Sequence, residues 1–221
     1  MASIKVFGSP ASAEVARVLT CLFEKDVEFL LIRVDNYKGQ KRMPEYLKLQ
    51  PQGQALTFED GKLTLTDSRE ICRHIAEKYV DQGNKGLLGT GTLERASIEL
   101  WLQTEANSFD PPSSELVFNL AFAPLMGLEQ DEVVIQRSRQ KLNKVLDIYD
   151  RRLQETRFLA GDNFTLADLS HLPNAQRLVS NNKCSSLITS RKKVSKWWDE
   201  ISSRPSWKRV VEMQQEPPPV I

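Results

Sequence analysis

The secondary-structure signals of this chain change at a polar, glycine-rich segment, residues 81–86. Before it, strand and helix patterns alternate in the order βαβ, α, ββ, α. After it, the clear hydrophobic periods all have the spacing of amphipathic helices, and no strand pattern is convincing. This distribution predicts a small mixed sheet with helices on both faces, followed by an all-helical part. We therefore expect an α/β domain over residues 1–80, a linker over 81–89 and an all-α domain over 90–221.

Four short runs in the first part have the composition of strands, and they cover residues 4–8, 29–34, 56–58 and 63–66. The run over 29–34 is mostly apolar, which is typical of a strand buried on both faces. The last two runs are joined by a turn that contains a glycine, as in a hairpin. Helical patterns lie between the strands and are expected over 13–24, 44–49 and 69–79.

The part after the linker has the pattern of consecutive amphipathic helices, expected over 93–109, 116–126, 132–153, 192–202 and 207–213. Thr165 and Asp168 have the spacing of a capping box at the start of a further helix. In isolation the two residues also suit a catalytic role, but the capping interpretation is favoured. Pro173 marks an early turn or kink in that helix.

Composition excludes several classes of function. The 221 residues carry a net charge of +1, which gives no footprint for nucleic acid. No apolar run approaches the ~20 residues of a membrane span, and the N-terminus lacks the pattern of a signal peptide. Three cysteines and two histidines are too few and too scattered for a disulfide framework or a metal site. We expect a cytoplasmic protein in a reducing compartment, with Cys21 and Cys72 in its core.

Ser12 lies between the first predicted strand and the first predicted helix. A serine at such a junction has its hydroxyl beside backbone N–H groups and at the positive end of the helix dipole. That place can hold an anion. The alternative is that Ser12 is only an N-cap, and the residue taken alone favours this alternative.

Several short motifs follow one another along the chain: Gly8-Ser9-Pro10-Ala11-Ser12, Arg17-Val18-Leu19, Pro51-Gln52-Gly53-Gln54, Glu59-Asp60-Gly61-Lys62-Leu63, Asp67-Ser68-Arg69, Phe158-Leu159-Ala160-Gly161-Asp162, Phe164-Thr165-Leu166-Ala167-Asp168, Trp197-Trp198 and Arg204-Pro205-Ser206-Trp207. In these motifs the chain resembles the plant phi class of the glutathione transferases, from about residue 4 to 211. The resemblance implies a thioredoxin-like α/β domain that binds glutathione, followed by an all-α domain that carries the site for a hydrophobic substrate.

The chemistry that the resemblance implies is conjugation of the glutathione thiolate to apolar electrophiles, with Ser12 as a hydrogen-bond donor to the sulfur. A free thiol has a pKa of roughly 8.5, and only the thiolate is a good nucleophile. Lowering that pKa to about 6.5 takes roughly 2.7 kcal/mol. One hydrogen bond to a charged group supplies ~1.5–3 kcal/mol. Ser12 can therefore stabilise the thiolate without acting as a base.

The resemblance also assigns residues to the rest of glutathione: Lys41 and Arg42 to the glycyl carboxylate, Gln54 and Ala55 to the peptide part, Asp67 to the ammonium group and Ser68 to the γ-glutamyl carboxylate. Without the resemblance, Asp67 and Ser68 would be a plain helix cap, and the two basic residues a solvated pair. Glutathione is a co-substrate here, and no cofactor or metal is implied.

The site for the electrophile is implied to be lined by Ala11 and by four residues of one predicted helix, Leu116, Val117, Phe118 and Leu120. The same apolar side chains are equally what a helical core requires.

Four positions depart from the family pattern. Leu56 replaces a proline that normally follows a cis peptide bond, and a cis bond without proline costs about 2.5–4 kcal/mol. We therefore favour a trans bond between Ala55 and Leu56. Asp67 replaces a glutamate, Lys41 a histidine, and Gln52 an aromatic residue that often inserts into the partner subunit. These changes predict weaker glutathione binding with the chemistry retained, and a weaker or more polar dimer contact.

Three classes of function compete on these observations. A homodimeric glutathione transferase is the leading hypothesis. The alternative is a weakly active or non-catalytic carrier of flavonoid-like or other apolar ligands, which the four departures favour and the retained Ser12 opposes. Thiol–disulfide exchange requires a cysteine at the strand–helix junction, where this chain has Ser12, and Cys21 lies more than two helical turns further on.

Overall fold

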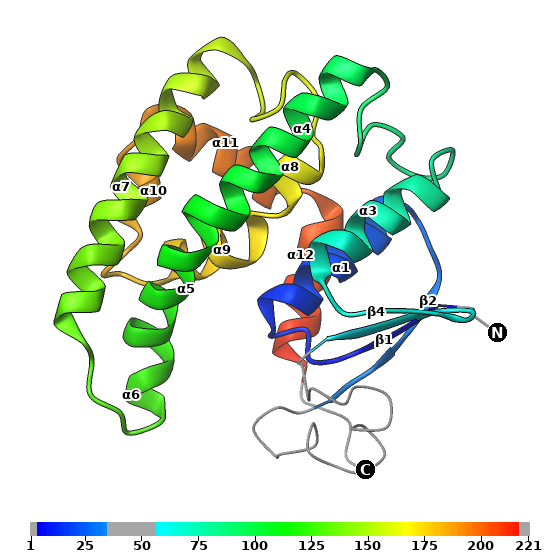
Figure 1. Ribbon diagram of the computed structural model, residues 1–221. Helices are drawn as coiled ribbons and strands as arrows, with labels where there is room; N and C mark the ends of the chain where they lie inside the picture. The colour runs from blue at the N-terminus through cyan, green and yellow to red at the C-terminus, as the bar shows by residue number, and fades with distance from the viewer. Residues whose placement is uncertain (1–3, 35–55, 217–221) are drawn as a thin grey trace. The chain divides into compact units, whose positions relative to one another are not determined.

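The computed structural model describes residues 4–34 and 56–216 (Figure 1). The chain forms two units, of which one comprises Met1–Lys85 with Pro205–Ile221 and the other Gly86–Arg204. The predicted helical domain over 90–221 needs one correction, because its last helix packs within the first unit. In the part of the chain that the structure describes, no helix has the length and apolar character needed to cross a membrane.

The first unit contains a four-stranded sheet in the order β2-β1-β3-β4. Its strands are β1 (Ile4–Phe7), β2 (Phe29–Ile32), β3 (Thr57–Asp60) and β4 (Leu63–Leu65). β1 pairs with β2 in parallel, whereas the β1–β3 and β3–β4 pairs are antiparallel. The register places Val6 level with Leu31 on one side and with Phe58 on the other. The prediction of a small mixed sheet is confirmed.

The prediction that the second strand is buried on both faces is wrong. β2 is the edge strand of the sheet that the described residues form, and Leu30 at its centre is 52% exposed. An apolar run does not distinguish a central parallel strand from an edge strand that is only partly covered.

Helix α1 (Ala13–Glu24) packs against both α3 (Ser68–Lys78) and α12 (Pro205–Gln215) within the first unit (Figure 1). Nine of its twelve residues are buried. The Cys21 thiol contacts the carbonyl of Cys72 on α3 at 3.6 Å, so the two cysteines lie in the core as predicted. The helix predicted over 44–49 lies outside the described residues.

The C-terminal end of α1 contacts the two segments at which the chain leaves and re-enters the first unit. Glu24 is 8% exposed, and its carboxylate accepts hydrogen bonds from Asn84 Nδ2 at 2.9 Å and from Ser206 Oγ at 2.5 Å. Lys25 donates from Nζ to the Asn84 carbonyl at 2.9 Å. Gly83 has a φ of +55°, and a Cβ there would lie 2.4 Å from the Glu24 carbonyl oxygen. Only glycine therefore fits at position 83 without a shift of the backbone.

Asp60, at the end of β3, fastens the sheet to α3. Its Oδ2 lies 2.9 Å from His74 Nε2 and 2.5 Å from Lys78 Nζ. Burial by itself raises the pKa of Asp60, but the hydrogen bonds from His74 and Lys78 outweigh burial and hold the pKa below its usual value. The ionised carboxylate is thus the form that the fold stabilises.

The second unit is helical, and in the described residues no strand follows β4. Its helices are α4 (Thr92–Thr104), α5 (Asp110–Val117), α6 (Ala123–Leu125), α7 (Glu132–Glu155), α8 (Leu166–Leu169), α9 (Leu172–Ser180), α10 (Ser186–Thr189) and α11 (Lys192–Ser202). Two π-helical segments, Glu105–Phe109 and Phe118–Phe122, connect α4 to α5 and α5 to α6. The helices predicted over 93–109 and 116–126 are thus joined, because residues 110–115, for which no helix was predicted, belong to α5 with prolines in its first turn.

The capping box predicted at Thr165 and Asp168 is present at the start of α8. Asp168 Oδ1 accepts from the Leu159 N–H at 3.0 Å and from Trp197 Nε1 at 2.9 Å, and Oδ2 accepts from the Thr165 N–H at 3.1 Å. Burial raises the pKa of Asp168 to about 6 even though these bonds lower it. This carboxyl group is committed to the fold of the helical unit, as the capping interpretation requires.

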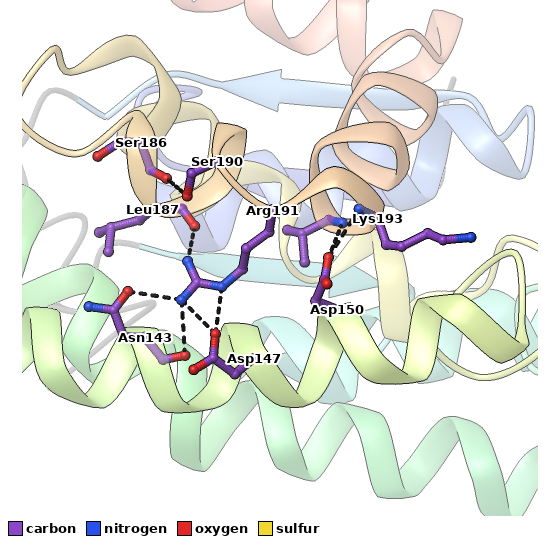
Figure 2. Close-up of polar contacts among 9 residues, drawn as sticks. Asn143, Asp147, Asp150, Ser186, Leu187, Ser190, Arg191 and Lys193 are labelled. Atoms are coloured by element: carbon purple, nitrogen blue, oxygen red, sulfur yellow. Dashed lines mark hydrogen bonds and ion pairs between the residues drawn. The ribbon is translucent and has the colours of Figure 1, made fainter.

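Figure 2 shows how Arg191 joins the segment before α11 to the long helix α7. Its Nη1 donates to the Leu187 carbonyl at 2.6 Å, and its Nη2 donates to Asp147 Oδ1 at 2.7 Å. One turn further along α7, Asp150 Oδ1 accepts from the Lys193 N–H at 3.0 Å and so caps α11. These polar contacts fix α10 and α11 on α7.

The close approach of Gly83 to the C-terminal end of α1 yields a stability prediction. Gly83→Ala is expected to lower the free energy of unfolding by about 1–3 kcal/mol more than Gly61→Ala does. Both glycines have a positive φ, which costs roughly 1–2 kcal/mol in alanine, but nothing lies within 4 Å of a Cβ at Gly61. Urea unfolding followed by circular dichroism measures both variants. Equal losses would contradict the steric role assigned to Gly83.

The contacts of Asp60 predict a pH dependence. A carboxyl group with a lowered folded pKa adds stability above its unfolded pKa of about 3.9, and this stability is lost as the pH falls through the folded pKa. Asp60→Asn is therefore expected to lower the urea midpoint at pH 7, and the gap to wild type is expected to narrow toward pH 3. A gap that stays constant from pH 7 to pH 3 would show that the charge of Asp60 is not the cause.

Candidate functional site

Ser12 lies where the sequence predicted, between β1 and α1. After β1, the Gly8 N–H bonds to the Ile32 carbonyl at 3.0 Å, and the chain then turns so that the Ser12 N–H bonds to the Ser9 carbonyl at 2.8 Å. Ser12 has extended backbone angles (φ −74°, ψ 136°), and its carbonyl accepts the first helical bond, from Ala16 at 2.9 Å. By backbone geometry Ser12 is thus the N-cap residue of α1.

The side chain of Ser12 makes no capping hydrogen bond, although its backbone is in the N-cap position. The simple capping interpretation of this hydroxyl is therefore not observed. The group is partly exposed and lies at the positive end of a buried, twelve-residue helix. An anion at this point would meet a hydroxyl donor and a favourable helix dipole.

Asp67 is the N-cap of α3 and does cap it. Its Oδ1 accepts from the N–H groups of Arg69 and Glu70, both at 2.9 Å. The cap does not use the N–H of Ser68, the first residue of the helix. The Oγ of Ser68 accepts a hydrogen bond at 2.7 Å from Nη1 of Arg17, on α1.

Arg17 is a residue of this region that our sequence interpretation did not assign to the site. It is 1% exposed, in the middle of an otherwise apolar stretch of α1. The available signal was a guanidinium at a position whose neighbours Ala16 and Val18 belong to the core, because a buried charge requires partners.

The other predicted glutathione-binding residues, Lys41, Arg42, Gln54 and Ala55, lie outside the described residues, as does Gln52. The bond between Ala55 and Leu56 is likewise outside them. Leu56 itself is described and fully buried.

The residues predicted to line the electrophile site differ in exposure. Ala11, in the first unit, is exposed. In the helical unit, Leu116 and Val117 are buried at 0% and 6% exposure, whereas Phe118 is 45% exposed and Leu120 is half-buried. Phe118 and Leu120 belong to the π-helical segment after α5, which turns its side chains away from the regular α-helical positions.

A cavity of about 720 Å³ lies elsewhere in the first unit. It is lined by Phe23, Asp26, Val27, Glu28, Phe29, Leu31, Arg209, Glu212, Met213 and Glu216. None of the predicted site residues is among them. In the described parts of the chain, no three His, Cys, Asp or Glu side chains are grouped to hold a metal ion.

Residues 2–77 match the model of the glutathione S-transferase N-terminal domain, and residues 109–205 match that of the C-terminal domain. Glutathione S-transferase F10 of Arabidopsis thaliana is 47% identical over 202 residues, which cover 91% of this chain and 94% of that protein.

Solved structures agree with this assignment. Glutathione transferase F2 of Populus trichocarpa is 55% identical, with a TM-score of 0.93, and the match covers 96% of this chain and 99% of that one. Maize glutathione S-transferase I, solved in complex with an atrazine glutathione conjugate, is 29% identical, with a TM-score of 0.88 and coverage of 97% and 99%. The thioredoxin-like unit and the helical unit are those that the resemblance implied. The chain belongs to the phi class of the glutathione S-transferase family and is a glutathione transferase.

Proposed function

We propose that Ser12 stabilises the thiolate of glutathione by donating a hydrogen bond to its sulfur, which then attacks an apolar electrophile. The observation that carries this proposal is the hydroxyl at the N-cap of α1, which makes no capping hydrogen bond. A hydroxyl with that position can donate its proton to a ligand without loss of a helix cap.

The free energy needed to stabilise the thiolate is within the range that one hydrogen bond from Ser12 and the helix N-terminus supply. Glutathione brings a thiol with a pKa of roughly 8.5, and half-ionisation near pH 6.5 takes roughly 2.7 kcal/mol of thiolate stabilisation. A hydrogen bond to a charged group contributes ~1.5–3 kcal/mol, and the N-terminus of α1 contributes about 0.3–1 kcal/mol. Ser12 acts as a donor in this scheme, and the thiol proton leaves to solvent.

The γ-glutamyl end of glutathione is proposed to bind at the start of α3. Its carboxylate accepts from Ser68, and its ammonium group lies by Asp67. Lys41 and Arg42 bind the glycyl carboxylate, and the peptide part pairs with the segment of Gln54 and Ala55. The departures at positions 41, 56 and 67 weaken glutathione binding more than they weaken the chemistry.

The electrophile is proposed to be an apolar, aromatic or heteroaromatic compound. The maize relative bound to an atrazine glutathione conjugate supports this class. Within the helical unit, Phe118 and Leu120 have side chains with exposed surface and are the proposed contacts, whereas Leu116 and Val117 support them from the core. The relatives compared above are named as transferases, so conjugation is preferred to the carrier function.

We also propose a homodimer in the cytoplasm. Leu93 and Leu100, one heptad apart on α4, are 88% and 63% exposed, which suits a face that a second copy covers. The cysteines Cys21, Cys72 and Cys184 are all free and buried, as in proteins of a reducing compartment.

The test of the proposed chemistry is Ser12→Ala. Loss of one hydrogen bond to the thiolate is expected to lower kcat/KM by about 10–100-fold with a generic aryl halide, and to raise the pKa of bound glutathione by about 1–2. The ultraviolet absorbance of the thiolate, titrated against pH in the binary complex, measures the pKa.

The stability of Ser12→Ala and the activity of Ser9→Ala are the controls for this test. Because the Ser12 side chain makes no capping hydrogen bond, Ser12→Ala is expected to leave the free energy of unfolding within about 0.5 kcal/mol of wild type. Ser9→Ala, three residues away, should retain both the rate and the thiol pKa. An unchanged thiol pKa in Ser12→Ala would refute the donor role.

Two substitutions of Asp67 separate its capping of α3 from the effect of its charge on glutathione binding. Asp67→Ala loses the bonds to the N–H groups of Arg69 and Glu70, so we expect about 1 kcal/mol lower stability and weaker glutathione binding. Asp67→Asn keeps a capping oxygen but loses the charge, so it should retain stability and still bind glutathione more weakly. Calorimetric titration and urea unfolding measure the two effects. Wild-type affinity in Asp67→Asn would mean that the charge does not contact the ammonium group.

A further inference from the structure

Arg17 and Ser68 form a buried link between α1 and α3. Nη1 of Arg17 donates to Oγ of Ser68 at 2.7 Å, and both residues are nearly inaccessible, at 1% and 2% exposure. A guanidinium is costly to remove from water. Its hydrogen bond to Ser68 places this positive charge directly beside a residue of the proposed glutathione site.

The direction of this hydrogen bond determines what the Ser68 hydroxyl can do. Arginine has donors and no acceptor, so Oγ of Ser68 must accept from Arg17. The proton of the hydroxyl is then left for a different acceptor. A carboxylate is the acceptor that gains most, because the hydroxyl is polarised by the cation and the charge of Arg17 attracts the anion through a medium of low dielectric constant.

Helix α1, which contains Arg17, also begins directly after Ser12, the residue proposed to bind the sulfur of glutathione. Ser12 is the N-cap of α1, and Arg17 lies five residues further along it. The Cys72 thiol contacts the Arg17 carbonyl at 3.7 Å, and the Cys21 thiol contacts the Cys72 carbonyl at 3.6 Å, so α1 is packed tightly on α3 at this level. A rigid pair of helices thus sets the positions of the Ser12 and Ser68 hydroxyls together.

We infer that Arg17 is a positioning residue for the γ-glutamyl carboxylate of glutathione. It holds the Ser68 hydroxyl as a donor toward that carboxylate and supplies a buried positive charge behind it. This inference rests on the proposed function and deepens it, because it makes recognition of one carboxylate depend on a residue that does not itself touch the reacting sulfur.

The test compares two ligands on three proteins. The ligands are glutathione and its analogue 4-aminobutyryl-cysteinylglycine, which lacks only the γ-glutamyl carboxylate. For wild type, the ratio of the two dissociation constants is expected to be about 10–100 in favour of glutathione. In Arg17→Met we expect the glutathione affinity to fall about tenfold or more, with the affinity for the analogue changed less than about threefold, so that the ratio collapses.

Ser68→Ala is the second variant, and it serves also if Arg17→Met proves unable to fold. It removes the hydroxyl but keeps the helix N-terminus, and the same collapse of the ratio is expected. In both variants KM for glutathione should rise by a larger factor than kcat at saturating glutathione falls, because the thiolate is stabilised elsewhere.

Several results would overturn the inference. A purely structural role of Arg17 would weaken both ligands by the same factor. A ratio unchanged in Ser68→Ala would show that its hydroxyl does not reach the carboxylate. Either result leaves the role of Ser12 intact, since the thiol pKa is measured separately. A wild-type protein that binds both ligands equally would instead overturn carboxylate recognition and this inference together.

Discussion

The burial of helix α1 is the constraint on which the described site depends. Nine of its twelve residues are buried, and it packs against α3 and α12 in the same unit. Ser12 begins this helix, Arg17 links its middle to α3, and Glu24 near its end holds Asn84 and Ser206. A helix held at its middle and at its end cannot rotate or slide without breaking buried polar contacts. The backbone that carries the Ser12 hydroxyl is thereby held in place, as the donor role proposed for this residue requires.

Much of this arrangement follows from local patterns in the sequence. The α1 boundaries and the capping box at Thr165 were predicted because each rests on signals within a few residues of one another, and the mixed sheet was predicted from the order of the strand and helix signals. The edge position of β2 and the packing of α12 in the first unit were not, because they depend on residues far apart in the chain. The π-helical connections around α5 were also missed, since hydrophobic periodicity does not distinguish them from breaks.

The candidate site shows the same division. Asp67 was expected to cap α3 and does so, because a capping aspartate needs only the N–H groups two and three residues further along the chain. At Ser12 the local signal was ambiguous, since a capping serine and a ligand-binding serine have the same sequence context. The structure adds that the Ser12 side chain makes no capping hydrogen bond. Arg17 could not be assigned from sequence because its partner Ser68 lies fifty-one residues away, on another helix.

The bond between Glu24 and Ser206 has a consequence for how the protein is made. It joins residues 182 positions apart, and α12 completes the packing around α1. A ribosome that has released the first eighty-five residues has supplied every strand of the described sheet, yet it has not supplied the last helix of the same unit. The first unit therefore reaches its final packing only after the whole helical unit has been synthesised. Until then, the surface of α1 that α12 covers is exposed during translation.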